Sequence, residues 1–194
     1  AVVIVNYNAG HDVRLALQSA ADEMVGRVWE GVVVDNASVD GSDRIVHEFA
    51  PQVRLLRNAQ NVGFGRAVNQ GIAASRAPLV LVMNPDCRLV SGALATLEAE
   101  LAAHHGCAIV GPRILDPDGS IQGSARGDPD MLTGLFGRAS GLRRHLPWLP
   151  VSRRNVVTDG TSDRHSGSVV VDWVSGACLL ARRDALLAVN GFDE

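Results

Sequence analysis

The chain has 194 residues, of which 46% are apolar and 20% are charged, and this is enough to build one α/β domain with a sizeable core. Its formal net charge of -3 gives no support for a nucleic-acid-binding protein. Three cysteines (Cys87, Cys107 and Cys178) lie far apart without a CxxC spacing, which favours a reduced compartment and argues against a disulfide framework or a structural zinc site.

The first expected strand, residues 1–5, is apolar and β-branched, and a polar turn with Tyr7 and Asn8 follows it. Tyr7 is the only tyrosine of the chain. Its ring can stack on a nucleobase or pack over the edge of the sheet, and the sequence leaves both readings open. Residues 12–25 have the apolar spacing of a helix, with Asp12 as the expected N-cap.

A second strand over residues 29–34 ends at Asp35, which places a carboxylate at the end of a buried strand. The loop over residues 39–42 is expected to cap a short helix that ends at Phe49, and a third strand covers residues 53–56. This alternation of strands and helices predicts a parallel sheet with right-handed crossovers.

Residues 57–71 are rich in asparagine and glycine and lead into a helix. Glycines allow close backbone approach to a ligand, and a helix N-terminus favours anions. The GxGxxG dinucleotide fingerprint fails because Val68 stands at the last glycine position, and the chain has no lysine for a Walker A motif. A nucleotide-facing loop of another kind and a plain glycine-rich helix start both remain open.

A fourth strand over residues 79–83 is apolar throughout, which is typical of a strand buried on both faces. It must end at Asn84-Pro85-Asp86, because Pro85 cannot donate to a β-ladder. Asp86 is therefore expected at the carboxyl end of a buried strand, the edge at which open α/β sheets bind ligands. There it either holds a hard cation such as Mg²⁺ or Mn²⁺ or caps the helix that follows.

The next helix is expected to begin with Ser91 as its cap and to end at residues 104–106, which contain two histidines. A strand over residues 107–110 follows. A hairpin is then expected over residues 114–121, because this stretch contains an Asp-Gly turn signal.

Residues 122–155 carry six arginines against two aspartates, a formal charge of +4, and we expect a long basic loop or insert there, with a short helix over residues 131–138. Such a loop suits an anionic or lipid-linked substrate near a membrane surface, and a plain solvated loop fits equally well. Beyond it, a strand with a kink at Gly176 is expected over residues 169–180, and a last helix over residues 183–189.

No apolar run reaches the length of a membrane span, and no signal peptide is visible. There are no internal repeats, so we expect a single domain over residues 1–194. The chain opens without Met inside a strand and stops at Glu194, and we expect both ends to be cut from a longer protein.

The order of the motifs resembles glycosyltransferase family two, and within it the rhamnosyltransferase-like members. The motifs that carry this resemblance are Val5-Asn6-Tyr7-Asn8, residues 34–42, residues 61–71, Asn84-Pro85-Asp86, residues 174–178 and Gly191-Phe192-Asp193-Glu194. The resemblance covers essentially the whole chain. It implies the α/β fold called GT-A, in which a mostly parallel central sheet with helices on both faces binds a nucleotide-sugar at its carboxyl edge.

The resemblance also implies residue roles. Tyr7 would lie against the base, Asp35 would accept a hydrogen bond from a pyrimidine imide, and Asp86 would bind the Mn²⁺ or Mg²⁺ that neutralises the diphosphate. Asn84 stands where the family's DXD-type motif has its first aspartate, so a carboxylate pair is not available. The expected nucleotide-sugar contacts are Tyr7, Asn8, Asp35, Asn36, Asn61, Gly63, Gly65, Asn69, Asn84 and Asp86, and the expected acceptor-side residues are Trp173, Ser175 and Gly176.

The implied activity is inverting, metal-dependent transfer of rhamnose from dTDP-rhamnose to a saccharide or polyprenyl-linked acceptor in cell-wall or surface polysaccharide synthesis. The implied location is the cytoplasm, at the inner face of the plasma membrane with peripheral membrane contact. A transferase for another UDP- or GDP-sugar, and a nucleotide-sugar-binding fragment without turnover, are the alternatives. The family's general base follows the Gly-Phe-Asp-Glu segment, so it is expected beyond Glu194 and no catalytic residue is assigned.

Overall fold

The computed structural model describes residues 1–122, 125–126 and 168–194. The chain divides into a main unit, Ala1–Pro112 with Gly176–Glu194, and a small unit, Arg113–Ser175. The expected helix over residues 131–138, and all of the expected basic loop except residues 122 and 125–126, lie outside the described residues.

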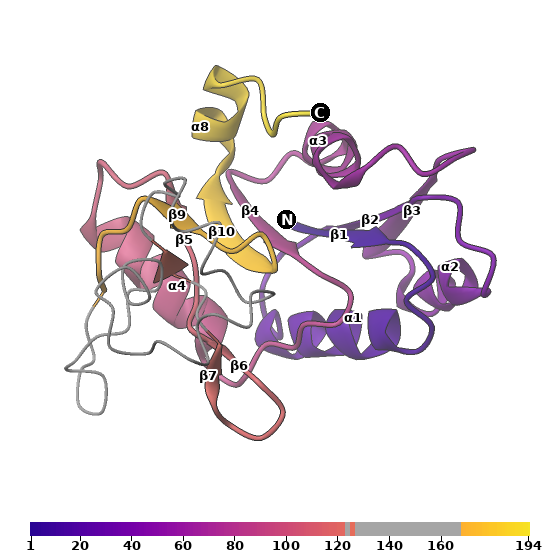
Figure 1. Ribbon diagram of the computed structural model, residues 1–194, viewed down its shortest axis with the longest axis horizontal. Coiled ribbons are helices and arrows are strands. Elements are labelled where there is room, and N and C mark those ends of the chain that lie inside the picture. Colours follow the sequence, from indigo (N-terminus) through magenta and orange to yellow (C-terminus); the bar gives the residue numbers. More distant parts are fainter. Residues whose placement is uncertain (123–124, 127–167) are drawn as a thin grey trace, which may run out of the picture. The chain divides into compact units, whose positions relative to one another are not determined.

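The main unit is a six-stranded sheet with helices on both faces (Figure 1). Its elements are β1 (Val2–Asn6), α1 (Asp12–Glu23), β2 (Gly31–Asp35), α2 (Ser42–Ile45), the 3₁₀-helix η1 (Val46–Phe49), β3 (Val53–Arg57), α3 (Phe64–Ala74), β4 (Leu79–Met83), α4 (Ala93–Ala103), β5 (Ile109–Val110), β10 (Cys178–Arg182) and α8 (Arg183–Ala188). These bounds confirm the expected order of strands and helices, mostly to within two or three residues.

The strand order is β3-β2-β1-β4-β10-β5. Strands β3, β2, β1 and β4 are parallel, and β10 runs antiparallel to both β4 and β5. The sheet grows outward from β1 through β2 and β3, and the chain then returns to the other side of β1 to form β4. The direction of winding therefore changes between β1 and β4, and at such a switch point the carboxyl ends of open α/β sheets form a crevice.

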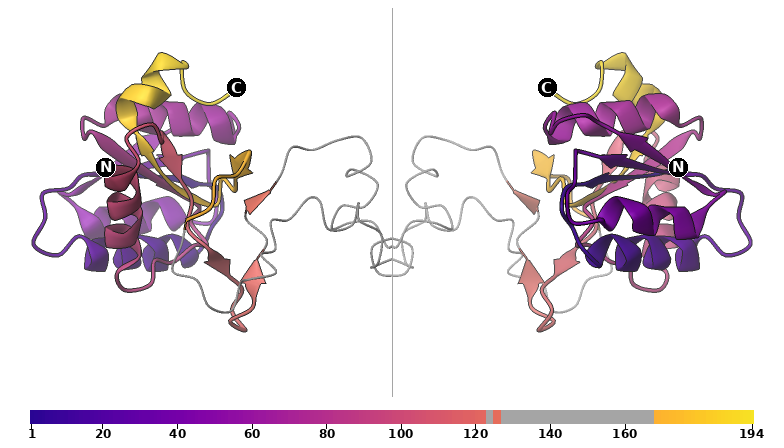
Figure 2. Two further views of the ribbon diagram at one scale, coloured as in Figure 1. Left: turned by 90° about the vertical axis from the view of Figure 1, so that its left-hand side faces the viewer. Right: turned by 90° about the vertical axis from the view of Figure 1, so that its right-hand side faces the viewer.

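The two faces of the sheet are covered by different helices. On one face, Ile4 and Leu81 belong to a buried cluster that includes the apolar residues of α1 and α4. On the other face α3 lies so close that a Cβ added at Gly71 would come within 2.4 Å of a Val3 methyl group. Figure 2 shows α3 and α8 on one side of the sheet and α1 and α4 on the other. Burial of alternate side chains on opposite faces explains why the central strands β1 and β4 are almost entirely apolar.

The structure corrects two of the expected helix caps, those of Asp12 and Ser91. Helix α1 begins at Asp12 itself, its N-cap is His11, and no side chain caps it. Helix α4 has Gly92 as its N-cap, with a φ of +81°, and Ser91 does not cap it. The Glu23 carboxylate at the end of α1 instead accepts hydrogen bonds from the backbone N–H groups of Gly92 (2.9 Å) and Leu94 (3.0 Å). A cap from a distant helix leaves no local pattern in the sequence, so the sequence could not predict it.

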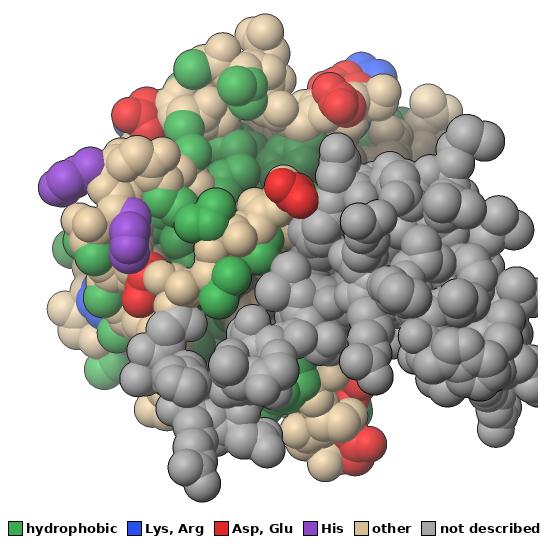
Figure 3. Space-filling model, turned by 60° about the vertical axis from the view of Figure 1, so that its left-hand side comes forward, with side chains coloured by type: hydrophobic (Ala, Val, Ile, Leu, Met, Phe, Trp, Pro, Cys, Tyr) green, Lys and Arg blue, Asp and Glu red, His purple; other side chains and the backbone are tan. Residues whose placement is uncertain are grey.

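The expected ends of α4 and α8 are confirmed. Helix α4 gives way to His104, which is exposed, and Figure 3 shows histidine side chains at the surface on this side of the molecule. Helix α8 is followed by Asn190 and Gly191, both with positive φ, as expected for a helix that ends in a left-handed turn.

The strand expected over residues 169–180 is wrong as a single element. Its first part, β9 (Trp173–Val174), pairs with β8 (Ala125–Arg126) in a two-stranded sheet of the small unit, and its last part contributes to β10 of the main sheet. The strand expected over residues 107–110 is shorter than predicted and covers only Ile109–Val110. The hairpin is confirmed, with β6 (Ile114–Leu115) antiparallel to β7 (Ile121–Gln122).

Candidate functional site

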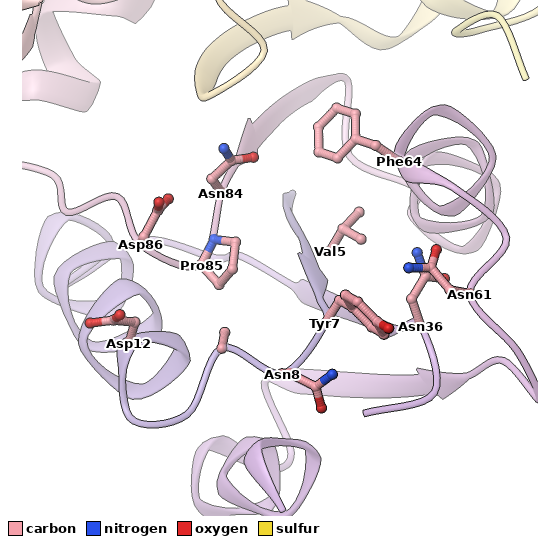
Figure 4. Close-up of a pocket in the computed structure, with 11 residues that line it drawn as sticks. Val5, Tyr7, Asn8, Asp12, Asn36, Asn61, Phe64, Asn84, Pro85 and Asp86 are labelled. Carbon is pink, nitrogen blue, oxygen red and sulfur yellow. The ribbon is translucent and has the colours of Figure 1, made fainter. Parts of the chain in front are cut away.

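A pocket of about 450 Å³ lies in the main unit at the carboxyl edge of the sheet (Figure 4). Its lining comes from the segments that follow β1, β2, β3 and β4, and it consists of Val5, Tyr7, Asn8, Ala9, Asp12, Asn36, Asn61, Phe64, Asn84, Pro85 and Asp86. It therefore occupies the switch point between β1 and β4, where the topology alone predicts a ligand crevice.

Six of the ten predicted nucleotide-sugar contacts meet in this pocket. They are Tyr7, Asn8, Asn36, Asn61, Asn84 and Asp86. Four others (Asp35, Gly63, Gly65 and Asn69) are not among the residues that line it. Asp12 lines the pocket although it was expected only as a helix cap, and Phe64 lines it within residues 57–71, which were expected either to face a nucleotide or simply to begin a helix.

Tyr7 presents a half-exposed ring to the pocket, since 53% of the residue is accessible. The neighbouring Asn8 has a φ of +52° and fixes the loop after β1 to the loop after β2. Its backbone N–H donates to Ser38 Oγ (2.9 Å), and its side-chain oxygen accepts from the Val39 N–H (2.8 Å). The Tyr7 ring is thus held at the pocket by a braced backbone, which suits a flat ligand that stacks on it.

Asp35 is buried next to the pocket, with 3% of its surface exposed. Its Oδ1 accepts a hydrogen bond from Asn6 Nδ2 (2.7 Å), and its Oδ2 accepts one from the Ser38 N–H (3.0 Å). Asn6 Nδ2 also lies within hydrogen-bond distance of the hydroxyl oxygens of Ser38 and Ser42. Asn6 is therefore the centre of a polar cluster beneath the pocket, a role that its position at a strand end did not reveal.

An amide network supports the part of the pocket formed by Asn36 and Asn61. Asn36 Nδ2 donates to the Gly63 carbonyl (3.2 Å), and Asn36 Oδ1 accepts from Asn58 Nδ2 (2.9 Å). Asn58 and Gln70 exchange two hydrogen bonds between their side-chain amides (2.9 and 3.0 Å). Asn61 Oδ1 accepts from the Gly63 N–H, so the start of α3 is tied to the loop before it. Gly63 thus helps to position Asn36 and Asn61, which line the pocket, without lining it itself.

Asp86 is exposed at the turn after β4, opposite Tyr7 in the pocket (Figure 4). The turn is fixed because the Asn84 N–H donates to the Ala177 carbonyl (2.7 Å) and the Cys87 N–H donates to the Asn84 carbonyl (3.1 Å). The second carboxylate of the pocket, Asp12, lies 3.6 Å from an Arg88 nitrogen. Both charged residues of the pocket lining are therefore acidic.

Two thiols near this turn have raised pKa values, and neither of them lines the pocket. Burial, with a smaller effect from Cys87, raises the pKa of Cys178 to about 12. Burial, followed by the charge of Asp86, raises the pKa of Cys87 as well. Oxygen atoms are then the donors that the pocket offers, and these suit Mg²⁺ or Mn²⁺ better than softer metals. In the described part of the chain, no three His, Cys, Asp or Glu side chains come together as a metal site, so a cation here would depend on Asp86 and on ligand or water oxygens.

The remaining predicted residues lie apart from the pocket lining. Asn69 and Gly65 contact the segment that follows α8, where Asn69 Nδ2 donates to the Phe192 carbonyl (2.8 Å). Of the expected acceptor-side residues, Trp173 and Ser175 belong to the small unit. Gly176 belongs to the main unit, where a Cβ added to it would lie 3.6 Å from the Phe64 ring.

Solved structures share the fold of this chain at low sequence identity. A mannosyltransferase of Pyrobaculum calidifontis, solved with GDP-Man and Mn²⁺, aligns with a TM-score of 0.63 and 18% identity over 99% of this chain and 46% of its own. Residues 1–349 of S. aureus TarS align with a TM-score of 0.58 and 17% identity over 100% of this chain and 49% of that one. The mixed sheet, with its helices on both faces, is therefore a GT-A glycosyltransferase fold.

Sequence comparison gives the family. Residues 1–167 match the family model of Glycosyl transferase family 2. The chain belongs to this glycosyltransferase family. An N-acetylglucosaminyl-diphospho-decaprenol L-rhamnosyltransferase of Mycobacterium tuberculosis is 35% identical over 207 residues, which cover 100% of this chain and 64% of that protein. The chain thus spans about two-thirds of the length of this relative.

The described residues contain no helix that is long and apolar enough to cross a membrane.

Proposed function

We propose that the protein is an inverting glycosyltransferase that transfers rhamnose from dTDP-rhamnose to a saccharide or polyprenyl-linked saccharide acceptor. The observation that carries this proposal is the pocket at the switch point, where Tyr7, four asparagines and Asp86 converge. A stacking ring, amides and a carboxylate on one crevice match a ligand with a base, a sugar and a diphosphate. The similarity to a decaprenol-linked rhamnosyltransferase supports the sugar and the type of acceptor.

The charge of the pocket supports a divalent cation. A nucleoside diphosphate is an anion, yet the two charged residues that line the pocket are Asp12 and Asp86. Without a cation, carboxylate and diphosphate would repel each other in a partly dehydrated crevice. Asp86 would hold Mn²⁺ or Mg²⁺, and the bound ion would supply Lewis-acid stabilisation of the diphosphate leaving group. The Mn²⁺ complex of the Pyrobaculum calidifontis mannosyltransferase shows that a protein of this fold binds such an ion.

In the proposed reaction, different residues would bind the base of the donor and remove the proton of the acceptor. Tyr7 would stack on the base, and Asp35, held by Asn6 and Ser38, would accept a hydrogen bond from the imide N–H of the base. In the transfer itself, the acceptor hydroxyl attacks the anomeric carbon, the bond from that carbon to the diphosphate oxygen breaks, and a general base takes the hydroxyl proton. We propose that this base lies in the chain that follows the Gly-Phe-Asp-Glu segment, and we place the enzyme in the cytoplasm at the inner membrane face, where polyprenyl-linked acceptors are anchored.

A donor screen tests the proposal. Thermal unfolding would be recorded with Mn²⁺ and, in turn, dTDP-rhamnose, UDP-GlcNAc and GDP-mannose, each paired with its nucleoside diphosphate. Because a ligand that binds only the folded state raises its stability, dTDP-rhamnose should give the largest rise in Tm. A larger Tm shift with another nucleotide-sugar would show that dTDP-rhamnose is not the preferred donor, but it would still support a glycosyltransferase. No shift with any of them would contradict the proposal as a whole.

A further inference from the structure

Phe64 forms an aromatic wall of the pocket, and Phe192, near the end of the chain, packs against it. The residue is 39% exposed and lines the pocket from the first turn of helix α3, across from Asn84 (Figure 4). The ring of Phe192 meets it edge-to-face, with centroids 6.4 Å apart and planes at 89°. A Cβ added at Gly176 would lie 3.6 Å from Phe64 Cε1. An edge-to-face partner fixes the plane of an aromatic ring more firmly than aliphatic packing does.

Asn69 holds Phe192 in place through its backbone. The Phe192 N–H donates to Asn69 Oδ1 (2.8 Å), and Asn69 Nδ2 donates to the Phe192 carbonyl (2.8 Å). Asn69 Nδ2 also lies 3.2 Å from Glu194 Oε1. The Asn69 amide thus forms hydrogen bonds with both the N–H and the carbonyl of Phe192, which lies 123 positions away in the sequence. A residue of a neighbouring β-strand pairs in the same way.

Two glycines make this approach possible. A Cβ added at Gly65 would lie 2.2 Å from the Asp193 carbonyl oxygen, and one added at Gly191 would lie 2.2 Å from Asn69 Oδ1. Gly191 also has a φ of +82°, which side chains rarely adopt. Helix α3 and the Gly191–Glu194 segment therefore pack closely together because Gly65 and Gly191 have no side chains.

We propose that the transferred sugar packs against the Phe64 ring. We further propose that Asn69 is a positioning residue, which fixes the orientation of this ring through Phe192. The proposal rests on the proposed function. The transferred sugar must lie between the diphosphate and the acceptor, because its anomeric carbon exchanges one for the other. Phe64 shares the pocket with Asp86, and its ring lies beside Gly176, the expected acceptor-side residue.

The chemistry of the ring fits a sugar. A hexose presents C–H groups on at least one face, and burying them against an aromatic ring removes apolar surface from water. A 6-deoxy hexose such as rhamnose adds a methyl group to that apolar surface. Tyr7, which enters the pocket from the segment after β1, stacks on the base in the proposed function, so Phe64 is available to contact the sugar (Figure 4).

The test compares binding of dTDP-rhamnose with binding of dTDP, both with Mn²⁺, by calorimetry. In the unaltered protein the sugar should increase affinity. Phe64→Leu should lower the affinity for dTDP-rhamnose about 2- to 10-fold, the equivalent of one aromatic contact, and change that for dTDP by less than about 2-fold. Phe64→Tyr keeps the ring and should keep the preference. Asn69→Ala should reproduce the loss of preference in part, although Asn69 does not line the pocket.

A matched control separates positioning from general loss of stability. Gln18→Ala removes the amide hydrogen bond to Asp22 on the exposed side of α1 and should leave the sugar preference unchanged. The proposal is overturned if Phe64→Leu or Asn69→Ala retains the full preference for dTDP-rhamnose over dTDP. If the unaltered protein binds neither compound, the proposed function fails as well. If it binds both equally, only the sugar surface is refuted.

Discussion

Asn6 Nδ2 lies 2.7 Å from Asp35 Oδ1, and this bond joins the carboxyl ends of two paired parallel strands inside the protein. Both residues are buried, with 0% and 3% of their surfaces exposed. The Asp35 carboxylate is therefore oriented by the fold before any ligand arrives. A group that is held in advance loses little entropy when it accepts a hydrogen bond from a base.

This arrangement leads to a prediction for Asp35→Ala. We expect the affinity for dTDP to fall by roughly 1–3 kcal/mol, because a buried polar contact to the base is lost. Calorimetry on protein with a native circular dichroism spectrum measures this. The matched variant Asn6→Ala leaves the carboxylate but removes its orienting bond, so its loss should be smaller. Unchanged dTDP affinity in Asp35→Ala would remove this residue from base recognition and leave it a purely structural role.

Glu23 should stabilise α4 from outside the helix. Its two carboxylate oxygens accept from the Gly92 and Leu94 N–H groups at the first turn of α4. We expect Glu23→Ala to lower the free energy of unfolding by about 1 kcal/mol, the usual cost of removing a helix cap. Urea denaturation measures it. Asp22→Ala, which removes a carboxylate paired with the exposed Gln18, should cost less than about 0.5 kcal/mol. Equal losses of unfolding free energy in both variants would show that the hydrogen bonds from Glu23 to α4 do not stabilise the protein.

Gly65→Ala should displace the Gly191–Glu194 segment from α3. The new Cβ would clash with the Asp193 carbonyl, which is backbone and cannot rotate away. Although alanine favours helices, we expect a loss of about 1–3 kcal/mol from the overlap. Hydrogen exchange of the Phe192 N–H, which donates to Asn69, reports the displacement directly.

The control for this substitution is Gly106→Ala, where a Cβ would meet nothing within 4 Å. It should leave the exchange of the Phe192 N–H unchanged. If that exchange is equally slow in Gly65→Ala, the contact between the segment and α3 does not depend on the missing side chain.

Glu30 should make stability depend on pH in the acidic range. Burial favours its neutral form, but the backbone N–H groups of Arg76 (2.5 Å) and Ala77 (3.1 Å) and the charge of Arg54 outweigh this and hold the pKa of Glu30 below its usual value. A lowered folded-state pKa contributes stability above the unfolded-state pKa, and this stability is lost as pH falls through the folded-state value.

Denaturation at several pH values tests this contribution. Between about pH 5 and pH 3, the unaltered protein should lose stability more steeply than Glu30→Gln, which has no proton to gain. The same slope for both proteins over this range would show that Glu30 does not provide the linkage.

The order of the strands and most of the pocket could be predicted from the sequence, because both follow from local patterns. The run over residues 79–83 that stops at Pro85 fixed the end of β4, and the polar residues after four parallel strands had to meet at one edge. The roles of Glu23 and Asn69 could not be predicted, because their partners lie 69 and 123 positions away. The break between β9 and β10 was missed because an apolar run does not reveal which sheet each half joins.

The most direct test of the account is the metal dependence of nucleotide binding at Asp86. Calorimetry would follow dTDP binding with Mn²⁺ and with EDTA, in the unaltered protein, in Asp86→Ala and in Asp184→Ala, a control on the exposed side of α8. We predict that Mn²⁺ strengthens dTDP binding to the unaltered protein and to Asp184→Ala, and that Asp86→Ala loses this dependence because Asp86 is the proposed protein ligand of the ion. Equal strengthening by Mn²⁺ in Asp86→Ala would contradict the account.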